Sequence, residues 1–192
     1  MEEENTSEPI KVVFVGTESV GKTSILNRIE NNTFHENLPP TVGGNSVHIS
    51  EYFNGANVNL NIWDTAGQER YRSMLSMYYH GSAIACIIFS LTCKESFDDI
   101  KKWHEEISNN SIPPKILVIG NKIDLNDQRQ VNYDYAKAYA KEIRAEYIEV
   151  SAKTGENMSE LKDILLNVAS KVKPKKKVTI EINDEPETKS CC

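Results

Sequence analysis

The segment KVVFVGTESVGKTSIL, residues 11–26, decides the fold, because it joins a strand pattern to a helix pattern through a glycine-bounded loop. Its spacing, Gly16-x-x-x-x-Gly21-Lys22-Thr23, is that of a phosphate-binding loop in the strand–loop–helix context that the mechanism requires. The glycines let successive backbone N–H groups face phosphate oxygens, while the helix N-terminus and the Lys22 ammonium supply positive charge. Thr23 offers a hydroxyl to Mg²⁺. We therefore expect a polyphosphate site here.

Outward from this loop, strand and helix patterns alternate. Apolar or alternating runs recur at 10–15, 47–52, 58–63, 83–91, 116–120 and 146–150, and helical spacing at 22–31, 69–79, 95–109, 133–144 and 158–172. This order predicts an α/β fold of the P-loop NTPase type, with a mostly parallel six-stranded sheet and helices on both faces. Asn54-Gly55 predicts a hairpin, and hence one antiparallel edge strand. Asn157 with Glu160 resembles a capping box at the start of the last helix.

Size and composition limit the possible classes of protein. The 192 residues fit one domain at 10–173 with disordered tails at 1–9 and 174–192. A net charge of −6 argues against a nucleic-acid partner, because the phosphate backbone needs a basic surface. The most apolar stretch, 83–91, is about half a bilayer span, and the start MEEENTSEPI has no signal-peptide pattern. We expect a cytosolic protein in which Cys86 and Cys93 are reduced thiols in or near the core.

The sequence GNKID, residues 120–124, selects the base of the nucleotide. Asn121, Lys122 and Asp124 follow an apolar run, which places them at the carboxyl end of a strand, where α/β proteins bind ligands. A carboxylate at Asp124 can accept hydrogen bonds from N1–H and the 2-amino group of guanine, a donor pair that adenine lacks. Ser151-Ala152-Lys153 follows the last strand run in the same way, and the Ala152 N–H can meet the guanine carbonyl. We therefore expect guanine rather than adenine.

A third element, WDTAGQERY at 63–71, is suited to the terminal phosphate. Asp64 ends a strand run and can reach Mg²⁺ through water, the Gly67 amide can meet a γ-phosphate, and Gln68 can orient the attacking water. Thr41, in the loop ENLPPTVGG, can complete the magnesium shell, and Phe34 can cover the face of the guanine ring. Together these elements predict a GTP/GDP site with Mg²⁺.

The chain resembles the small GTPases of the Ras superfamily over residues 10–173. Five elements match in order: GTESVGKT, Thr41, DTAGQ, NKID and SAK. The resemblance implies a Ras-like G domain whose nucleotide is bound by Glu18, Ser19, Val20, Gly21, Lys22, Thr23, Ser24, Phe34, Thr41, Gly67, Asn121, Lys122, Asp124, Ser151, Ala152 and Lys153, whose Mg²⁺ is held by Thr23, Thr41 and Asp64, and whose catalytic residues are Gln68, Lys22 and Gly67.

Within that superfamily the chain is similar to Rab proteins. The likeness rests on NLNIWDTAGQERY, on YYHGS at 78–82 and on the terminal pair Cys191-Cys192. It implies that both cysteines are geranylgeranylated, because two lipid chains anchor a protein stably where one anchors it marginally. The implied partners are an escort protein, a dissociation inhibitor, an exchange factor, an activating protein and effectors. We expect a monomer in the cytoplasm and, through its lipids, on the cytoplasmic face of an endomembrane.

Two stretches depart from the Rab pattern. After Thr41, Rabs usually carry a segment that ends in an aromatic residue, whereas this chain has VGGNS at 42–46, so Ser46 adds no ring to Trp63 and Tyr78. Glu18 stands in the phosphate loop where relatives carry glycine or another small residue. Two unit charges about 5 Å apart repel by about 3 kcal/mol at an effective dielectric constant near 20, so we expect the Glu18 carboxylate to turn outward from the phosphates.

The sequence therefore predicts a Rab-like switch that binds GTP, hydrolyses it slowly and regulates vesicle traffic. The alternative is a GTP-binding module with little hydrolysis, because Glu18 crowds the space that Gln68 or an incoming arginine needs. A third class, an ATP-dependent P-loop kinase or ATPase, is disfavoured by NKID and SAK.

Overall fold

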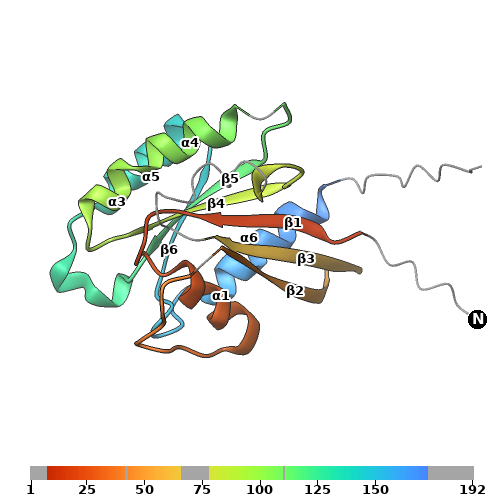
Figure 1. Ribbon diagram of the computed structural model, residues 1–192, viewed down its shortest axis with the longest axis horizontal. Coiled ribbons are helices and arrows are strands. Elements are labelled where there is room, and N and C mark those ends of the chain that lie inside the picture. The colour runs from red at the N-terminus through yellow and green to blue at the C-terminus, as the bar shows by residue number, and fades with distance from the viewer. Residues whose placement is uncertain (1–7, 42, 66–77, 110, 173–192) are drawn as a thin grey trace, which may run out of the picture.

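The computed structural model describes residues 8–41, 43–65, 78–109 and 111–172. Within them a six-stranded sheet has the order β2-β3-β1-β4-β5-β6 (Figure 1). The strands are β1 (Ile10–Val15), β2 (Gly44–Phe53), β3 (Ala56–Thr65), β4 (Ile84–Ser90), β5 (Lys115–Asn121) and β6 (Glu146–Val150). All neighbours pair in parallel except β2 and β3, which confirms the predicted fold class.

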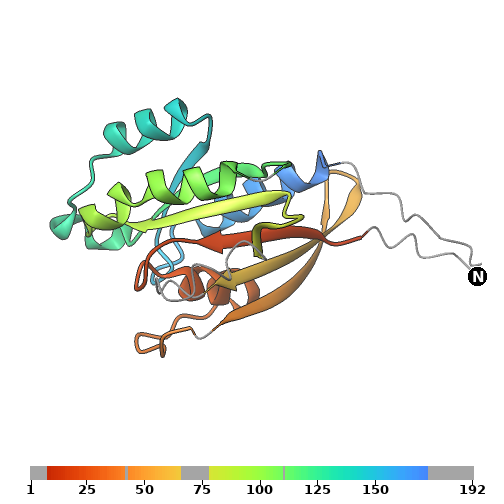
Figure 2. The same cartoon turned by 45° about the horizontal axis from the view of Figure 1, so that its top comes forward.

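Helices cover both faces of this sheet. They are α1 (Lys22–Asn31), α3 (Lys94–Asp98), α4 (Ile100–Ser108), α5 (Tyr133–Glu142) and α6 (Met158–Ser170), with a 3₁₀ segment η2 (Ile123–Gln128). In Figure 2, α4 in green and α5 in cyan lie above the strands and α1 in orange-red lies below them. Both faces are apolar because side chains alternate along β1: Val12 and Phe14 pack with α1 and α6, and Val13 and Val15 pack with α4 and α5.

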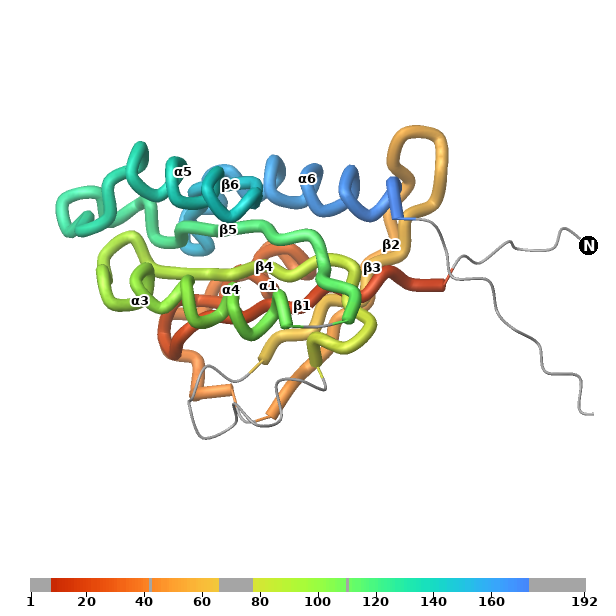
Figure 3. The backbone as a smooth tube through the Cα atoms, turned by 90° about the horizontal axis from the view of Figure 1, so that it is seen from above, coloured from red at the N-terminus to blue at the C-terminus, as the bar shows by residue number. Residues whose placement is uncertain are grey.

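The β2–β3 hairpin forms the antiparallel edge. Asn54 and Gly55 at its tip have φ angles of 49° and 85°, the left-handed pair that a tight hairpin turn requires, so the prediction from Asn-Gly is confirmed. Figure 3 shows this hairpin beside α6, and Lys162 of α6 forms an ion pair with Glu51 of β2. No helix in the described ranges is both long and apolar enough to cross a bilayer.

Two predictions about helices differ from the structure, and others fall largely outside the described residues. The helix expected at 95–109 is divided into α3 and α4 at Asp99, although Asp99 keeps helical angles (φ −72°, ψ −13°). The capping box at Asn157 is wrong: Asn157 is left-handed (φ 57°), and its amide donates to the Glu149 carbonyl at 2.8 Å instead of capping α6. Most of the helix expected at 69–79, and nearly all of both predicted tails, lie outside the described residues.

A partly buried ion pair holds β6 against the segment that follows η2. The Arg129 guanidinium donates to both Glu149 carboxylate oxygens, at 2.9 and 2.7 Å, and the Tyr147 hydroxyl donates to Glu149 Oε1 at 2.6 Å. Burial and this hydrogen bond raise the pKa of Tyr147 far above its usual range. Since only 5% of the Glu149 side chain is exposed, its charge depends on these donors.

This pair yields a prediction about stability. Arg129→Met leaves the Glu149 carboxylate without its cation, so we expect the free energy of unfolding, from urea titration at saturating GDP, to fall by about 2–3 kcal/mol. Lys94→Met is the matched control, because the Lys94–Asp98 pair is exposed (59% and 53%); its loss should leave the free energy of unfolding close to that of wild type. Equal losses in the two variants would contradict this account of the buried pair.

Candidate functional site

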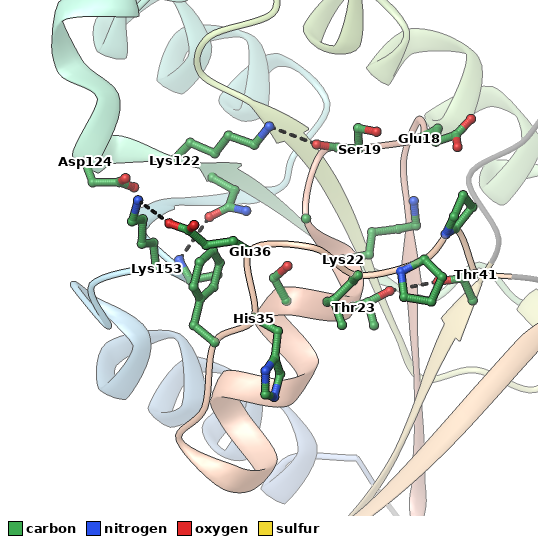
Figure 4. Close-up of a pocket in the computed structure, with 18 of the residues that line it drawn as sticks. Glu18, Ser19, Lys22, Thr23, His35, Glu36, Thr41, Lys122, Asp124 and Lys153 are labelled. Carbon is green, nitrogen blue, oxygen red and sulfur yellow. Dashed lines mark hydrogen bonds and ion pairs between the residues drawn. The ribbon is translucent and has the colours of Figure 1, made fainter.

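The predicted loops meet in one pocket of about 500 Å³ at the carboxyl edge of the sheet (Figure 4). Four chain segments form it: the loop after β1 with the start of α1, the segment 34–41, the end of β5 with the start of η2, and the turn after β6. Its lining residues are Glu18, Ser19, Gly21, Lys22, Thr23, Ser24, Phe34, His35, Glu36, Leu38, Pro39, Pro40, Thr41, Asn121, Lys122, Asp124, Leu125, Ala152 and Lys153.

Lys22 is held by the phosphate loop itself. Its ammonium donates to the carbonyl oxygens of Gly16 and Thr17, both at 2.9 Å, and the residue is only 6% exposed. Burial lowers the pKa of Lys22 to about 8, while the charges of Asp64 and Glu18 oppose this shift. A buried cation in a loop of backbone N–H groups is suited to a polyphosphate anion.

Two hydroxyls converge on one buried carboxylate beside Lys22. Thr23 Oγ1, at the start of α1, donates to Asp64 Oδ2 at 2.6 Å and lies 2.8 Å from Thr41 Oγ1. Asp64 is 1% exposed, and burial raises its pKa against the hydrogen bonds from both threonines and the charge of Lys22. Its other oxygen, Oδ1, has no hydrogen-bond partner among the described residues. Hydroxyl and carboxylate oxygens of this kind fit Mg²⁺, which prefers hard oxygen ligands and keeps several waters.

Asn121 connects the phosphate side of the pocket to the base side. Its amide Nδ2 donates to the Val20 carbonyl at 2.9 Å, and its Oδ1 accepts from the Ala152 N–H at 3.2 Å. Lys122, with a left-handed backbone (φ 73°), extends along the phosphate loop and donates to the Ser19 carbonyl at 2.9 Å. Val20 is therefore a buried support of the pocket, and its side chain does not line it.

Asp124 is oriented by Ser151. The fully buried Ser151 donates from Oγ to Asp124 Oδ1 at 2.6 Å, and the same Oγ accepts from the Thr154 N–H at 3.0 Å. This orients the carboxylate, and both of its oxygens keep acceptor sites for a ligand. Asp124 and Ala152 both line the pocket, so an acceptor and a backbone segment face the same cavity, as recognition of a guanine edge requires.

The rim of the pocket includes residues that the sequence analysis did not select. His35, Glu36, Leu38 and the two prolines lie between Phe34 and Thr41, and Leu125 follows Asp124. Figure 4 shows Glu36 and Lys153 meeting at the rim; their side chains are 71% and 54% exposed and 3.1 Å apart. The only sequence signal for the residues between Phe34 and Thr41 was their position between two predicted contacts.

Glu18 is exposed, and in Figure 4 its carboxylate extends away from Ser19 and Lys122, although Glu18 lines the pocket and its charge opposes the lowering of the Lys22 pKa. The exposure agrees with the outward orientation expected from charge repulsion. Gly67, Gln68, Cys191 and Cys192 lie outside the described residues.

The departure after Thr41 has a structural counterpart. Ser46 pairs with Trp63 across β2 and β3, and the ring of Tyr78 lies 5.8 Å from that of Trp63, tilted by 51°. A Cβ on Gly44 would come within 2.6 Å of the Tyr78 ring. The Tyr78 ring therefore rests on the backbone of β2, at a position that a side chain on residue 44 would block.

Comparisons with known proteins agree with this geometry. The sequence model of the Ras family matches residues 11–173. The chain is 40% identical over 149 residues to the Ras-related protein RabJ of Dictyostelium discoideum, a match that covers 77% of this chain and 58% of RabJ. It is 41% identical over 154 residues to the Ras-related protein Rab-22A of Mus musculus and of Homo sapiens, covering 79% of this chain and 79% of each relative. The chain thus belongs to the Ras family of small GTPases, enzymes that bind and hydrolyse GTP, and within that family it is a Rab-like protein.

Proposed function

We propose that this Rab-like GTPase is a switch of membrane traffic that cycles between GTP and GDP, with Mg²⁺, in the pocket after β1. The convergence of Thr23, Thr41 and Asp64 carries this proposal. Thr41 comes from a loop that reaches the pocket from outside the sheet, whereas Thr23 and Asp64 belong to α1 and β3. A contact that depends on a bound cation and terminal phosphate can therefore hold or release that loop.

The phosphates are bound by the loop backbone and Lys22. Its ammonium leaves the carbonyls of Gly16 and Thr17 for the phosphate oxygens, an exchange that keeps this buried cation hydrogen-bonded. Thr23, Thr41 and Asp64 would hold Mg²⁺, and the ion would neutralise charge at the phosphates. The backbone amides of residues 18–24 complete the cradle.

The base of the nucleotide is selected on the side of the pocket opposite the phosphate loop. Asp124 accepts from N1–H and the 2-amino group, and the Ala152 N–H, which also donates to Asn121 Oδ1 at 3.2 Å, donates to the guanine carbonyl. Asn121, Lys122 and Ser151 hold these groups in place, while Phe34 and the stem of Lys153 cover the ring. An adenine base would leave the Asp124 carboxylate without its donors, and this loss of hydrogen bonds gives the discrimination.

Hydrolysis follows an in-line displacement. The oxygen of a water positioned by Gln68 bonds to the γ-phosphorus, the bond to the β–γ bridging oxygen breaks, and GDP and inorganic phosphate leave with the water's protons. Gly67 contacts the γ-phosphate through its amide. An activating protein contributes an arginine, worth about 10³–10⁵ in rate. The alternative of a module with little hydrolysis is not favoured, since the family match is to GTP-hydrolysing proteins.

Membrane attachment completes the cycle. Geranylgeranyl groups on Cys191 and Cys192 give the two chains that stable anchoring requires. The protein then shuttles between cytoplasm and the cytoplasmic face of an endomembrane, as a monomer served by an escort protein, a dissociation inhibitor, an exchange factor, an activating protein and effectors.

The role of Gln68 is tested by single-turnover hydrolysis of GTP. Gln68→Leu removes the groups that orient the water, so the rate should fall by about tenfold or more while GDP affinity is unchanged. Gln128→Leu, at an exposed position of η2, is the control and should match wild type. An unchanged rate in Gln68→Leu would contradict this role.

A second variant, Glu18→Gly, tests whether Glu18 crowds the space that Gln68 or an incoming arginine needs. Its rate of GTP hydrolysis is compared with that of wild type, with and without an activating protein. Equal rates in Glu18→Gly and wild type would dismiss this crowding.

The anchor is tested in cells with tagged protein. Cys191→Ser/Cys192→Ser should move the protein from membranes to the cytoplasm and leave GDP affinity unchanged, because no lipid can be attached. Cys93→Ser, which changes a partly exposed thiol in the described domain, is the control and should remain on the membrane. A double variant that still sediments with membranes as wild type does would contradict the proposed anchor.

A further inference from the structure

Arg28, in the last turn of α1, bridges to the turn after β6. Its Nε donates to the Ala152 carbonyl at 2.9 Å and its Nη2 to the Lys153 carbonyl at 2.8 Å. Its Nη1 donates to the Asn32 carbonyl at 2.7 Å and to Asn32 Oδ1 at 3.2 Å. All three guanidinium nitrogens are thus used on uncharged carbonyl oxygens, and two of these oxygens lie more than 120 residues away along the chain.

The two distant carbonyls belong to the residues that the base site uses. On the other side of Ala152, Ser151 is fixed by its bond to Asp124, and its N–H donates to the Glu156 carbonyl at 3.1 Å. Ala152 therefore sits between Ser151 before it and the Arg28 fork after it, and its own N–H donates to Asn121 Oδ1 at 3.2 Å. With both neighbouring peptide groups held, the direction of this N–H is set before a nucleotide binds, and the guanine carbonyl would share the donor with Asn121 Oδ1.

The same helix carries the phosphate site. Lys22 and Thr23 are the first residues of α1, and Arg28 lies in its last turn. The helix is about 15 Å long at 1.5 Å per residue, so it spans the pocket from phosphate to base. A displacement of α1 at one end is thereby transmitted to the turn at the other. At the rim, the backbone position of Lys153 also determines whether its side chain meets Glu36.

We propose that Arg28 is a positioning residue for guanine recognition, which holds the Ala152 N–H toward the carbonyl of the base and thereby slows nucleotide release. The inference rests on the proposed role of Ala152 in binding guanine. A merely structural role, capping the C-terminal end of α1 through Asn32, would stabilise the domain without changing which base is preferred.

The test compares GDP with 6-thioguanosine diphosphate, in which sulfur, a poor acceptor, replaces the carbonyl oxygen while N1–H and the 2-amino group remain. Equilibrium affinities and release rates are measured for full-length wild type, Arg28→Met and Arg28→Lys. Lys171→Met, which removes one exposed positive charge just beyond α6 and outside the pocket lining, is the control.

Wild type should prefer GDP over the thio analogue. In Arg28→Met we expect GDP affinity to fall by about tenfold and affinity for the analogue by less than about threefold, so that the preference shrinks. Arg28→Lys, which keeps the charge but lacks the planar fork, should lie between the two. Lys171→Met should match wild type.

Three outcomes would overturn the inference. If both Arg28 variants lose equal affinity for GDP and for the thio analogue, Arg28 acts only as a structural cap of α1. If neither affinity changes in the variants, Arg28 has no role in nucleotide binding. Equal binding of the two ligands by wild type would remove the Ala152 contact itself, and this result marks a failure of the proposed base site, as distinct from a failure of Arg28.

Discussion

The buried side-chain amide of Asn121 is the interaction on which the rest of the site depends. Asn121 is 2% exposed. Its amide donates to the Val20 carbonyl of the phosphate loop and accepts from the Ala152 N–H of the turn after β6, here called the base loop. Its position is set by the sheet, since β5 pairs with β4 and β6 up to Asn121 itself. Gly21 is required by the same contact, because a Cβ there would lie 2.3 Å from Asn121 Nδ2. Two loops that are distant in sequence thus form a single pocket.

The topology explains why much of this could be predicted from sequence. Parallel strands bring their carboxyl ends to one edge, so residues directly after β1, β3, β5 and β6 had to meet there. Asp64, Asn121 and Ser151 could each be identified from the strand run that precedes them. The hairpin could be predicted because Asn-Gly satisfies a local backbone requirement at φ values of 49° and 85°.

What the sequence did not reveal depends on tertiary contacts. Arg28 has the pattern of a solvated helix residue, yet it binds carbonyls of the base loop 124 and 125 residues away. Asn157 with Glu160 fits a local cap, but the nearby Glu149 carbonyl takes the amide instead. Likewise, the rim pair Glu36–Lys153 joins two loops separated by 117 residues, and no spacing rule links them.

The edge beside the pocket carries one of the two departures from the Rab pattern noted in the sequence, the segment after Thr41. Gly44 and Ser46 leave room on β2, and the Tyr78 ring rests there against Trp63. The aromatic surface therefore consists of the Trp63 and Tyr78 rings, next to Thr65 and Asp64 at the end of β3. The same strand pair carries Asp64, the predicted magnesium ligand, so this surface lies next to the proposed nucleotide site.

The central claim is that the pocket distinguishes guanine from adenine through Asp124 and Ala152. Equilibrium titration of the nucleotide-free, full-length protein with GDP and with ADP, both in Mg²⁺, tests it most directly. A site built around these hydrogen bonds should bind GDP roughly 10⁴-fold more tightly than ADP. Comparable affinities for the two nucleotides would contradict the account.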